Sequence, residues 1–467
     1  MEPDTILEEK SFRDSIATVK DGKRVWIFAQ KPKGKLYTKR TLLSIVYLIV
    51  FFSLPFVKIH GEPPFLLNVL ERKFILFGVV FWPQDLFLFV LGFLTFIVFI
   101  VLFTVVFGRV FCGWACPQTI FMEMVFRKIE YWIEGNANQQ KALDRQAWDT
   151  EKIRKRGLKI IVFFAISFLI ANTFLSYIIG ADEVRKMIVE PVAQNIGTLI
   201  SLLIFTGIFF GVFFWFREQA CIVVCPYGRL QGVLLDKNSI LVAYDYLRGE
   251  PRAKYSKKQE DKKGDCIDCF QCVKVCPTGI DIRNGTQLEC VNCTACIDVC
   301  DYMMESVGSA KGLIRYDSEN GIANKQKLKI TPRIISYSVV LVLLIGILVA
   351  VLASRKDVET SILRTPGLLY QVQANNSLSN LYNIKLINKT RKDMPISLKI
   401  ESGSGEIQMI GKKIITVKKE SIASGEFFVI LNRKQIKNRK TKLSIGVYSN
   451  DKKIETVKTN FLGVTKK

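Results

Sequence analysis

The chain has 467 residues, of which 49% are hydrophobic, and it carries a net charge of +24 with one His. This composition indicates a membrane protein with basic faces, and no nucleic-acid-binding signature accompanies the charge, so nucleic acid is excluded as the expected partner. A b-type haem with two axial His ligands is excluded because His60 is the only His.

Five apolar runs predict transmembrane helices, since about 20 such residues cross a hydrocarbon core. A polar arm, residues 1–40, precedes them and lacks a signal-peptide pattern. The apolar segment 74–84 is too short to span and is expected to be re-entrant or interfacial, with Trp82 at the headgroup level. The predicted spans are residues 41–57, 86–107, 160–180, 191–216 (with its start nearer Ile196) and 334–354.

The Lys and Arg counts of the loops predict the orientation of these spans. The arm has ten basic residues and the 108–159 loop has ten, against three in 58–84 and two in 181–190. Loops rich in Lys and Arg stay inside, so the arm and the 217–333 segment are expected to be cytoplasmic. An odd number of spans then places residues 355–467 outside.

Two pairs of Cys share the pattern Cys-x3-Cys-Pro. Cys112 and Cys116 follow the second predicted span, and Cys221 and Cys225 follow the fourth. The order of span, outer loop, span and motif is an internal repeat, and two halves packed side by side would bring four thiols together. Cys at i and i+4 share a helix face, so each pair could chelate one ion.

Arg109 and Arg217 precede the two motifs and are expected to favour thiolates, which bind Cu(I) in preference to harder ions. The two Cys-x3-Cys-Pro pairs are also compatible with a further iron–sulfur centre, a zinc centre or a dithiol–disulfide relay. Two inert, buried thiol pairs are a weaker explanation, because the motif is duplicated. The four Cys are therefore predicted to be metal-binding and catalytic, with the occupant left open by the residues alone.

The other eight Cys form two consecutive runs of the spacing C-x2-C-x2-C-x3-C. All twelve Cys thus lie in tight clusters, which indicates redox or metal chemistry rather than a disulfide scaffold. The doubled spacing is typical of bacterial proteins that hold two [4Fe–4S] clusters, where the fourth Cys of each run ligates the other cluster. Zinc is a weaker explanation for these eight Cys, because a zinc site needs only four ligands and no third x2 spacing. The predicted ligands are Cys266, Cys269, Cys272 and Cys300 for one cluster, and Cys276, Cys290, Cys293 and Cys296 for the other.

The last 113 residues contain no Cys and hold 23 basic and 9 acidic residues. Short segments rich in Ile, Val, Thr and Phe alternate there with turn residues, which predicts an antiparallel, immunoglobulin-like sandwich. The basic surface is expected to be a solvated face, or a docking surface for anionic lipid or an acidic partner. The predicted strands are 381–388, 396–400, 414–417, 427–431, 443–448 and 454–461.

The sequence therefore predicts a polytopic α-helical membrane protein with about five transmembrane helices, a cytoplasmic 2[4Fe–4S] ferredoxin-like insert and a C-terminal all-β immunoglobulin-like domain. The predicted parts are an N-terminal arm (1–40), a membrane domain of four helices (41–216), the ferredoxin-like domain (217–333), a fifth helix (334–354) and an exported domain (355–467).

In the combination and order of its motifs, the chain resembles the FixG/CcoG family of cytochrome c oxidase accessory proteins. The ferredoxin run alone is shared by many proteins, whereas the combination is specific and covers nearly the whole chain. The segments that carry the resemblance are 72–74, 81–85, 108–119, 133–135, 217–219, 225–227, 244–252, 276–285 and 311–316.

The resemblance implies a membrane metalloreductase of the bacterial inner membrane that reduces Cu(II) to Cu(I) for assembly of a cbb3-type oxidase. Copper would then be its substrate ion, and a copper exporter or oxidase assembly factors its partners. No flavin or nicotinamide fingerprint identifies the electron donor. Two alternatives remain: a quinol-linked iron–sulfur module that feeds periplasmic reductases, and a non-catalytic scaffold for oxidase assembly.

Overall fold

The structure is a computed structural model whose chain divides into two compact units, Met1–Gly78 with Leu86–Leu348 and Val79–Asp85 with Val349–Lys467. His60 and the start of the fourth predicted span, residues 191–195, lie outside the described residues. The described residues are 19–20, 23–59, 61–69, 73–77, 79–82, 85–189, 196–254, 264–325, 330–354, 357–367, 369–373, 376–390, 392–402, 404–411, 415–419, 421–436 and 438–464.

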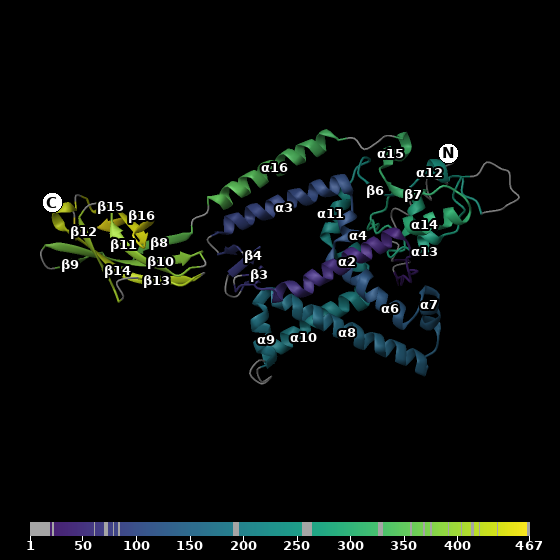
Figure 1. Ribbon diagram of the computed structural model, residues 1–467, viewed down its shortest axis with the longest axis horizontal. Helices are drawn as coiled ribbons and strands as arrows, with labels where there is room; N and C mark the ends of the chain where they lie inside the picture. The colour runs from purple at the N-terminus through teal and green to yellow at the C-terminus, as the bar shows by residue number, and fades with distance from the viewer. Residues whose placement is uncertain are drawn as a thin grey trace. The chain divides into compact units, whose positions relative to one another are not determined.

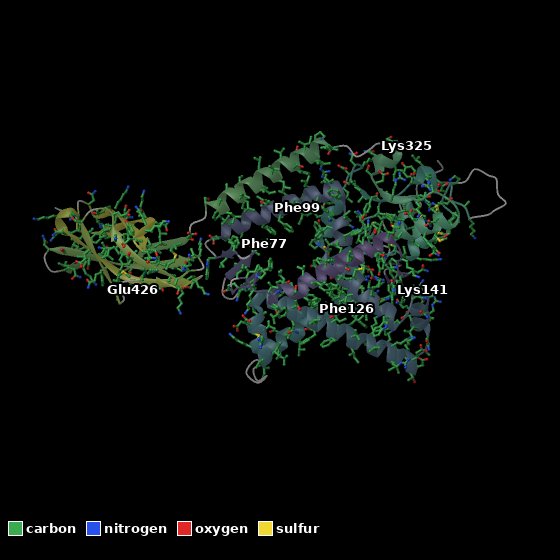
Figure 2. All side chains as sticks on the ribbon, in the orientation of Figure 1. Phe77, Phe99, Phe126, Lys141, Lys325 and Glu426 are labelled. Carbon is green, nitrogen blue, oxygen red and sulfur yellow. The ribbon has the colours of Figure 1, made fainter. Side chains whose placement is uncertain are left out.

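Five helices in the described part of the chain are long and apolar enough to cross a membrane, as predicted. Their side chains are largely exposed, as expected for a lipid-facing surface; Phe99, labelled on the second of these helices in Figure 2, is one of the exposed side chains. The helices are α2 (Lys35–Ser53) continued by η1 (Leu54–Phe56), α3 (Leu86–Phe107), α8 (Thr150–Ile179), α10 (Ile196–Gly211) continued by η5 (Val212–Phe216), and α16 (Pro332–Ala353) (Figure 1).

Two of these helices begin before the predicted starts because charged side chains cap them. Asp298 accepts hydrogen bonds from the backbone N–H groups of Leu36 and Tyr37, at 3.1 and 2.7 Å, and so holds the first turn of α2. Asp149 caps α8 by accepting from Lys152 N at 2.8 Å. Capping satisfies N–H groups that a helix start leaves unpaired, so polar residues join the apolar run in one helix.

Short elements connect these helices: α4 (Val110–Trp114), α5 (Pro117–Thr119), η3 (Ile120–Phe126), α6 (Arg127–Ile133), α7 (Ala137–Arg145) and α9 (Ala181–Val189). Phe126, labelled in Figure 2, packs with Phe163 and Phe213 into an aromatic core between η3, α8 and η5. The rings of Phe126 and Phe213 stack at 4.5 Å. This core joins the two predicted halves of the membrane domain.

The segment predicted to be re-entrant or interfacial, 74–84, forms β-strands in its described part, and its position at a membrane surface stays a prediction. β4 (Lys73–Leu76) pairs in an antiparallel hairpin with β3 (Phe65–Asn68), and β5 (Val79–Phe81) forms a further strand. Trp82 is buried, with 8% of its surface exposed, and its predicted place at the headgroup level stays a prediction.

The ferredoxin-like region follows η6 (Ala220–Val224) and α11 (Pro226–Leu234). Its strands β6 (Leu241–Tyr244) and β7 (Ile314–Asp317) pair antiparallel, with Leu241 opposite Asp317. Buried Val242, Ile280 and Leu313 share a core with the Cys side chains. Its helical elements are α12 (Tyr246–Gly249), α13 (Gln271–Lys274), η7 (Ile282–Asn284), α14 (Ala295–Ser306) and α15 (Glu319–Asn324).

The second unit contains a sandwich of two antiparallel sheets, which confirms the immunoglobulin-like prediction. One sheet has the order β12-β14-β10-β8 with β9 also on β10, and the other has the order β13-β11-β15-β16. Tyr382 and Phe427 stack in the core between them at 5.5 Å. The strands are β8 (Val358–Arg364), β9 (Gln371–Gln373), β10 (Ser377–Asn388), β11 (Met394–Ile400), β12 (Gly405–Met409), β13 (Ile415–Val417), β14 (Ile422–Asn432), β15 (Lys440–Ser449) and β16 (Lys452–Leu462).

Each of the six predicted strands corresponds to one of these nine. The three that were not predicted, β8, β9 and β12, have polar residues or Gly at more than half of their positions, which weakens the apolar signal.

Candidate functional site

The eight Cys of the ferredoxin run line two cavities, divided as the spacing rule predicts. Cys272 lies between the two cavities and contributes to the lining of both. The first is lined by Cys266, Cys269, Cys272 and Cys300, and the second by Cys276, Cys290, Cys293 and Cys296. The last Cys of each run therefore faces the cavity of the other run.

The backbone folds around the second Cys of each run in the same unusual way. Asp268 and Phe270 flank Cys269 with φ of 51° and 57°, and Asn292 and Thr294 flank Cys293 with φ of 52° and 66°. Left-handed residues turn successive N–H groups inward and form concave anion-binding nests, which occur at iron–sulfur sites. The loops therefore fit a negatively charged thiolate cluster.

Burial controls the charge of these thiols. It raises the pKa of Cys272, Cys290 and Cys300 to about 12 and that of Cys293 to about 11. A buried thiolate is costly unless a cation compensates its charge, and iron supplies that compensation in a cluster. The donor set and its surroundings thus fit two [4Fe–4S] clusters.

The four Cys of the repeated motifs are close enough to one another to interact electrostatically. Cys221 interacts electrostatically with Cys112, Cys116 and Cys225, and Cys112 interacts with Cys116 and Cys225. The two halves are joined here by Tyr227, whose hydroxyl lies 3.3 Å from that of Thr104. We call Cys112, Cys116, Cys221 and Cys225 the four-thiol site.

The prediction that each motif pair shares one helix face is wrong. Cys112 lies within α4 and Cys221 within η6, whereas Cys116 and Cys225 lie beyond those segments and begin α5 and α11. Pro117 and Pro226 cause this break, because Pro is favoured in the first turn of a new helix and disfavours helical backbone in the preceding residue. Each pair therefore flanks a helix break.

The prediction that neighbouring Arg side chains favour thiolates is also wrong in its net effect. Burial raises the pKa of Cys112 to about 12, although Arg109 opposes the shift. Burial and the neighbouring thiols raise the pKa of Cys221 to about 12 as well. Both thiols are thus protonated at neutral pH unless a metal binds them.

Polar residues without a recognised motif surround the four-thiol site. Cys112 Sγ donates to Gln231 Oε1 at 3.0 Å, and Gln231 Nε2 donates to Thr104 Oγ1 at 3.4 Å. The buried Thr119 hydroxyl lies near Cys221, where it opposes the larger effect of burial, which raises the pKa of that thiol. Sequence reasoning missed Thr119 and Gln231. The only signal that could have found them is their position, three residues after Cys116 and six residues after Cys225.

The second ferredoxin loop packs directly on the first motif. A Cβ atom at Gly113 would overlap Val291 O and lie 2.8 Å from Asn292 O. Trp114 Nε1 donates to Tyr316 Oη at 3.1 Å, which in turn donates to Asn292 O at 3.3 Å. The ligand loop of the second cavity and the four-thiol site are therefore adjacent.

Two arginines donate hydrogen bonds to the backbone where the ferredoxin loop packs on the first motif. Arg40 of α2 donates to Gly113 O at 2.6 Å. Arg109 donates to Leu288 O and, at 3.5 Å, to Cys290 O. Both side chains are buried, so the junction is fixed from the membrane helices and from the turn after α3.

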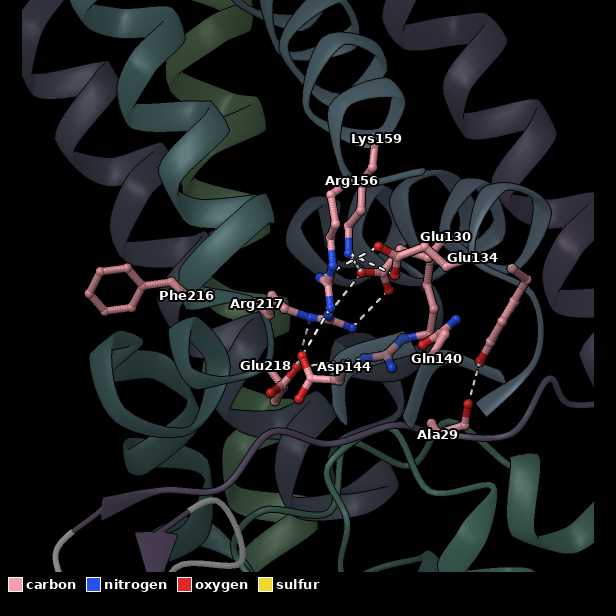
Figure 3. A network of polar contacts seen from close by, with 12 residues as sticks. Ala29, Glu130, Glu134, Gln140, Asp144, Arg156, Lys159, Phe216, Arg217 and Glu218 are labelled. Carbon is pink, nitrogen blue, oxygen red and sulfur yellow. Dashed lines mark hydrogen bonds and ion pairs between the residues drawn. The ribbon is translucent and has the colours of Figure 1, made fainter. Parts of the chain in front are cut away.

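A buried network of ion pairs lies beside the second motif (Figure 3). Arg217 forms two 2.9 Å contacts with the carboxylate of Glu130, and Lys159 binds the same carboxylate at 2.6 Å. Burial opposes ionisation of Glu130, yet Arg217 and Lys159 lower its pKa to about 2. Glu130 therefore stays charged at every physiological pH.

Three protein-family models match the chain. A 4Fe-4S dicluster domain matches residues 216–319, and a 4Fe-4S binding domain matches residues 89–136. The IG-like fold at the C-terminal of FixG matches residues 348–464. The chain thus contains two 4Fe–4S binding domains and the C-terminal domain that the sequence predicts.

The chain is also similar to curated proteins over most of its length. It is 35% identical to Protein RdxA of Cereibacter sphaeroides, over 82% of this chain and 83% of that protein. It is 31% identical to the nitrogen fixation protein FixG of Rhizobium meliloti, over 81% of this chain and 80% of that protein.

A crystal structure of a FixG-related protein from Vibrio parahaemolyticus matches 23% of this chain and 97% of that one, at 19% identity and a TM-score of 0.20. The family assignment rests on the full-length relatives and not on this match. The chain belongs to the FixG family of membrane iron–sulfur proteins.

Proposed function

We propose that the protein is a membrane-bound metalloreductase that reduces Cu(II) to Cu(I) at the four-thiol site for assembly of a cbb3-type cytochrome c oxidase. One observation carries this proposal: the ligand loop of the second ferredoxin cavity, at Val291 and Asn292, packs on Gly113 between Cys112 and Cys116. Adjacent sites favour electron transfer between them.

The residues present fit two resident [4Fe–4S] clusters, held by the two sets of four Cys that line the cavities. When bound and reduced, these clusters supply one electron per copper ion, and a donor outside this chain restores that electron. The protein residues bury the sulfurs, orient them through the left-handed turns at Asn292 and Thr294, and hold the ligand loop against the membrane domain.

The four-thiol site is suited to copper as a substrate. Cu(II) gains one electron and becomes Cu(I), and thiols that bind the ion release their protons to water. Thiolates are soft ligands and hold Cu(I) in preference to harder ions. The raised pKa of Cys112 and Cys221 makes the metal-free thiols neutral, which also makes release of the product ion by reprotonation feasible.

The proposal includes the orientation and the partners. Lys35 and Arg333 lie at the ends of α2 and α16 nearest the ferredoxin-like region, and Arg109 follows α3. These basic residues support a cytoplasmic location for that region in a bacterial inner membrane. The second unit would then be periplasmic, where its basic face would meet oxidase assembly factors or anionic lipid. A copper exporter would take the product ion.

Titration of the reduced, detergent-purified protein with Cu(II) under anaerobic conditions tests the proposal. We expect the cluster EPR signals to disappear in proportion to the copper added, while a chelator detects an equal amount of Cu(I). Clusters that stay reduced in the presence of Cu(II) would contradict the proposal.

A second candidate function is supported by the 4Fe–4S binding model that matches residues 89–136, a segment with only Cys112 and Cys116. Together with Cys221 and Cys225 these could hold a third cluster, and the chain would then be an electron-transfer module. Iron analysis tests the third cluster: about twelve Fe per chain would support it, whereas about eight would leave the four-thiol site free for copper.

A further inference from the structure

Both halves of the membrane domain have a residue with a positive φ at the same position before their motifs. Gly108 and Arg217 each lie four residues before the first Cys of a motif, and their φ angles are 54° and 53°. The turns close alike, since Cys116 N donates to Phe111 O at 2.9 Å and Cys225 N donates to Ala220 O at 2.8 Å. The repeat thus extends to a positive φ before each motif and to the backbone hydrogen bond that closes each motif.

The residue at this position differs between the halves. Gly108 adopts a positive φ without strain, because it has no Cβ. Arg217 has φ of 53° and ψ of −125°, a conformation that a residue with a Cβ rarely adopts. Such strain persists only where the surroundings impose it, and it concentrates at functional sites.

The surroundings of Arg217 supply that constraint. Its guanidinium makes the two contacts with Glu130, lies 3.5 Å from Glu218 and stacks at 4.6 Å on the ring of Trp26. Only 2% of its surface is exposed. The planar fork of an arginine matches a carboxylate in two places, so its orientation is fixed as well as its position.

The partner comes from the other half of the repeat. Glu130 lies on α6, in the continuous helical stretch that begins with Pro117 after Cys116, whereas Arg217 precedes Cys221. We infer that Arg217, held by Glu130, is a positioning residue: the ion pair imposes the turn that brings Cys221 and Cys225 to Cys112 and Cys116.

The alternative is that Arg217 only stabilises the fold through the ion-pair network, and this alternative predicts different effects of substitution at position 217. If only the charges matter, alanine and glycine at position 217 are equally harmful, since both remove the guanidinium. If the turn matters, glycine substitutes for the arginine, because it adopts the positive φ without support, as Gly108 does in the first half.

The test is the reactivity of Cys221 and Cys225 toward N-ethylmaleimide in the full-length holoprotein, measured by peptide mass spectrometry in Arg217→Ala and Arg217→Gly. We expect alkylation to be roughly tenfold faster in Arg217→Ala and to return to within about threefold of wild type in Arg217→Gly. Combining Arg217→Gly with Glu130→Gln removes the carboxylate that has lost its arginine partner, while Lys159 keeps its ion pair with Glu134 at 3.2 Å, and should keep this protection. Arg156→Ala, a change at the exposed end of the network, is the matched control and should leave alkylation unchanged.

Equal alkylation in the alanine and glycine variants would overturn the inference, and so would wild-type protection in Arg217→Ala. The inference concerns the site of the proposed function, but alkylation does not require copper. If wild type fails to reduce Cu(II) while glycine rescues protection, the proposed function falls and the positioning role stands. If wild type reduces Cu(II) but Arg217→Gly does not restore protection, the proposed function stands and the positioning role falls.

Discussion

Gly113 lies so close to Val291 that a methyl group on its α-carbon would overlap the Val291 carbonyl oxygen. The two residues belong to different domains of the first unit: Gly113 separates the Cys of the first membrane motif, and Val291 follows Cys290 of the ferredoxin run. The missing side chain therefore sets how closely the ferredoxin loop approaches the four-thiol site.

Gly113→Ala should separate these two sites. The added Cβ would also lie 2.8 Å from Asn292 O and 2.9 Å from Asn292 C, and backbone atoms cannot turn aside as a side chain can. We expect the rate of Cu(II) reduction to fall roughly tenfold, with the cluster EPR signals retained, because overpacking shifts the backbone. Gly207→Ala, whose Cβ meets no atom within 4 Å, is the matched control. Equal rates in the Gly113→Ala variant and its control would show that this contact does not govern electron delivery.

Substitution of the last Cys of a ferredoxin run should affect the cluster of the other run. Cys300 lines the cavity of Cys266 and Cys269, so Cys300→Ser should remove the same EPR signal as Cys269→Ser. Cys276→Ser should remove the signal that Cys293→Ser removes. If Cys300→Ser and Cys293→Ser instead remove one common signal, each run holds its own cluster and the assignment is wrong.

Gln231→Leu should weaken the four-thiol site without affecting the ferredoxin clusters. The fully buried amide contacts Cys112 Sγ at 3.0 Å and has a donor and an acceptor, so it can stabilise either protonation state of the sulfur. Loss of a hydrogen bond to a charged sulfur corresponds to about 2 kcal/mol, or roughly 30-fold in Cu(I) affinity. Competition with a Cu(I) chelator measures this change. Gln231→Glu, which keeps an acceptor but loses the amide donor, separates hydrogen bonding from packing.

Metal binding at the four-thiol site should strengthen as the pH rises. Burial raises the pKa of Cys112 and Cys221 to about 12, so both thiols carry protons at pH 6 to 8 and must lose them to bind an ion. Each released proton contributes about a tenfold gain in affinity per pH unit, so the two together predict about 100-fold. Chelator competition at three pH values would reveal this slope, and an affinity independent of pH would mean that these thiols do not ligate the ion.

Local sequence patterns predicted the helices and strands of this protein, whereas contacts between residues far apart in sequence determine how these elements pack together. The five spans and six strands were predictable because apolar periodicity and turn residues act over short distances. The cap of α2 was not, since Asp298 lies 262 positions from Leu36. The same holds for Arg217 and Glu130, which are 87 positions apart and whose pairing no motif records.

The candidate site shows the same division. The cluster ligands follow from spacing alone, because a fixed loop length brings their sulfurs together. The convergence of the four motif thiols was predicted from the repeat, but the helix breaks at Cys116 and Cys225 were missed, since Pro117 and Pro226 override the i, i+4 relation. The raised thiol pKa values were missed because burial depends on the packed fold.

The most direct test of the account is rapid anaerobic mixing of reduced protein with Cu(II), comparing wild type with Cys112→Ser. Serine leaves the ferredoxin ligands intact but removes a soft sulfur from the four-thiol site. The account predicts that copper oxidises the clusters in wild type and leaves them reduced in Cys112→Ser, with EPR signals of equal initial intensity. Clusters oxidised by Cu(II) as fast in Cys112→Ser as in wild type would contradict it.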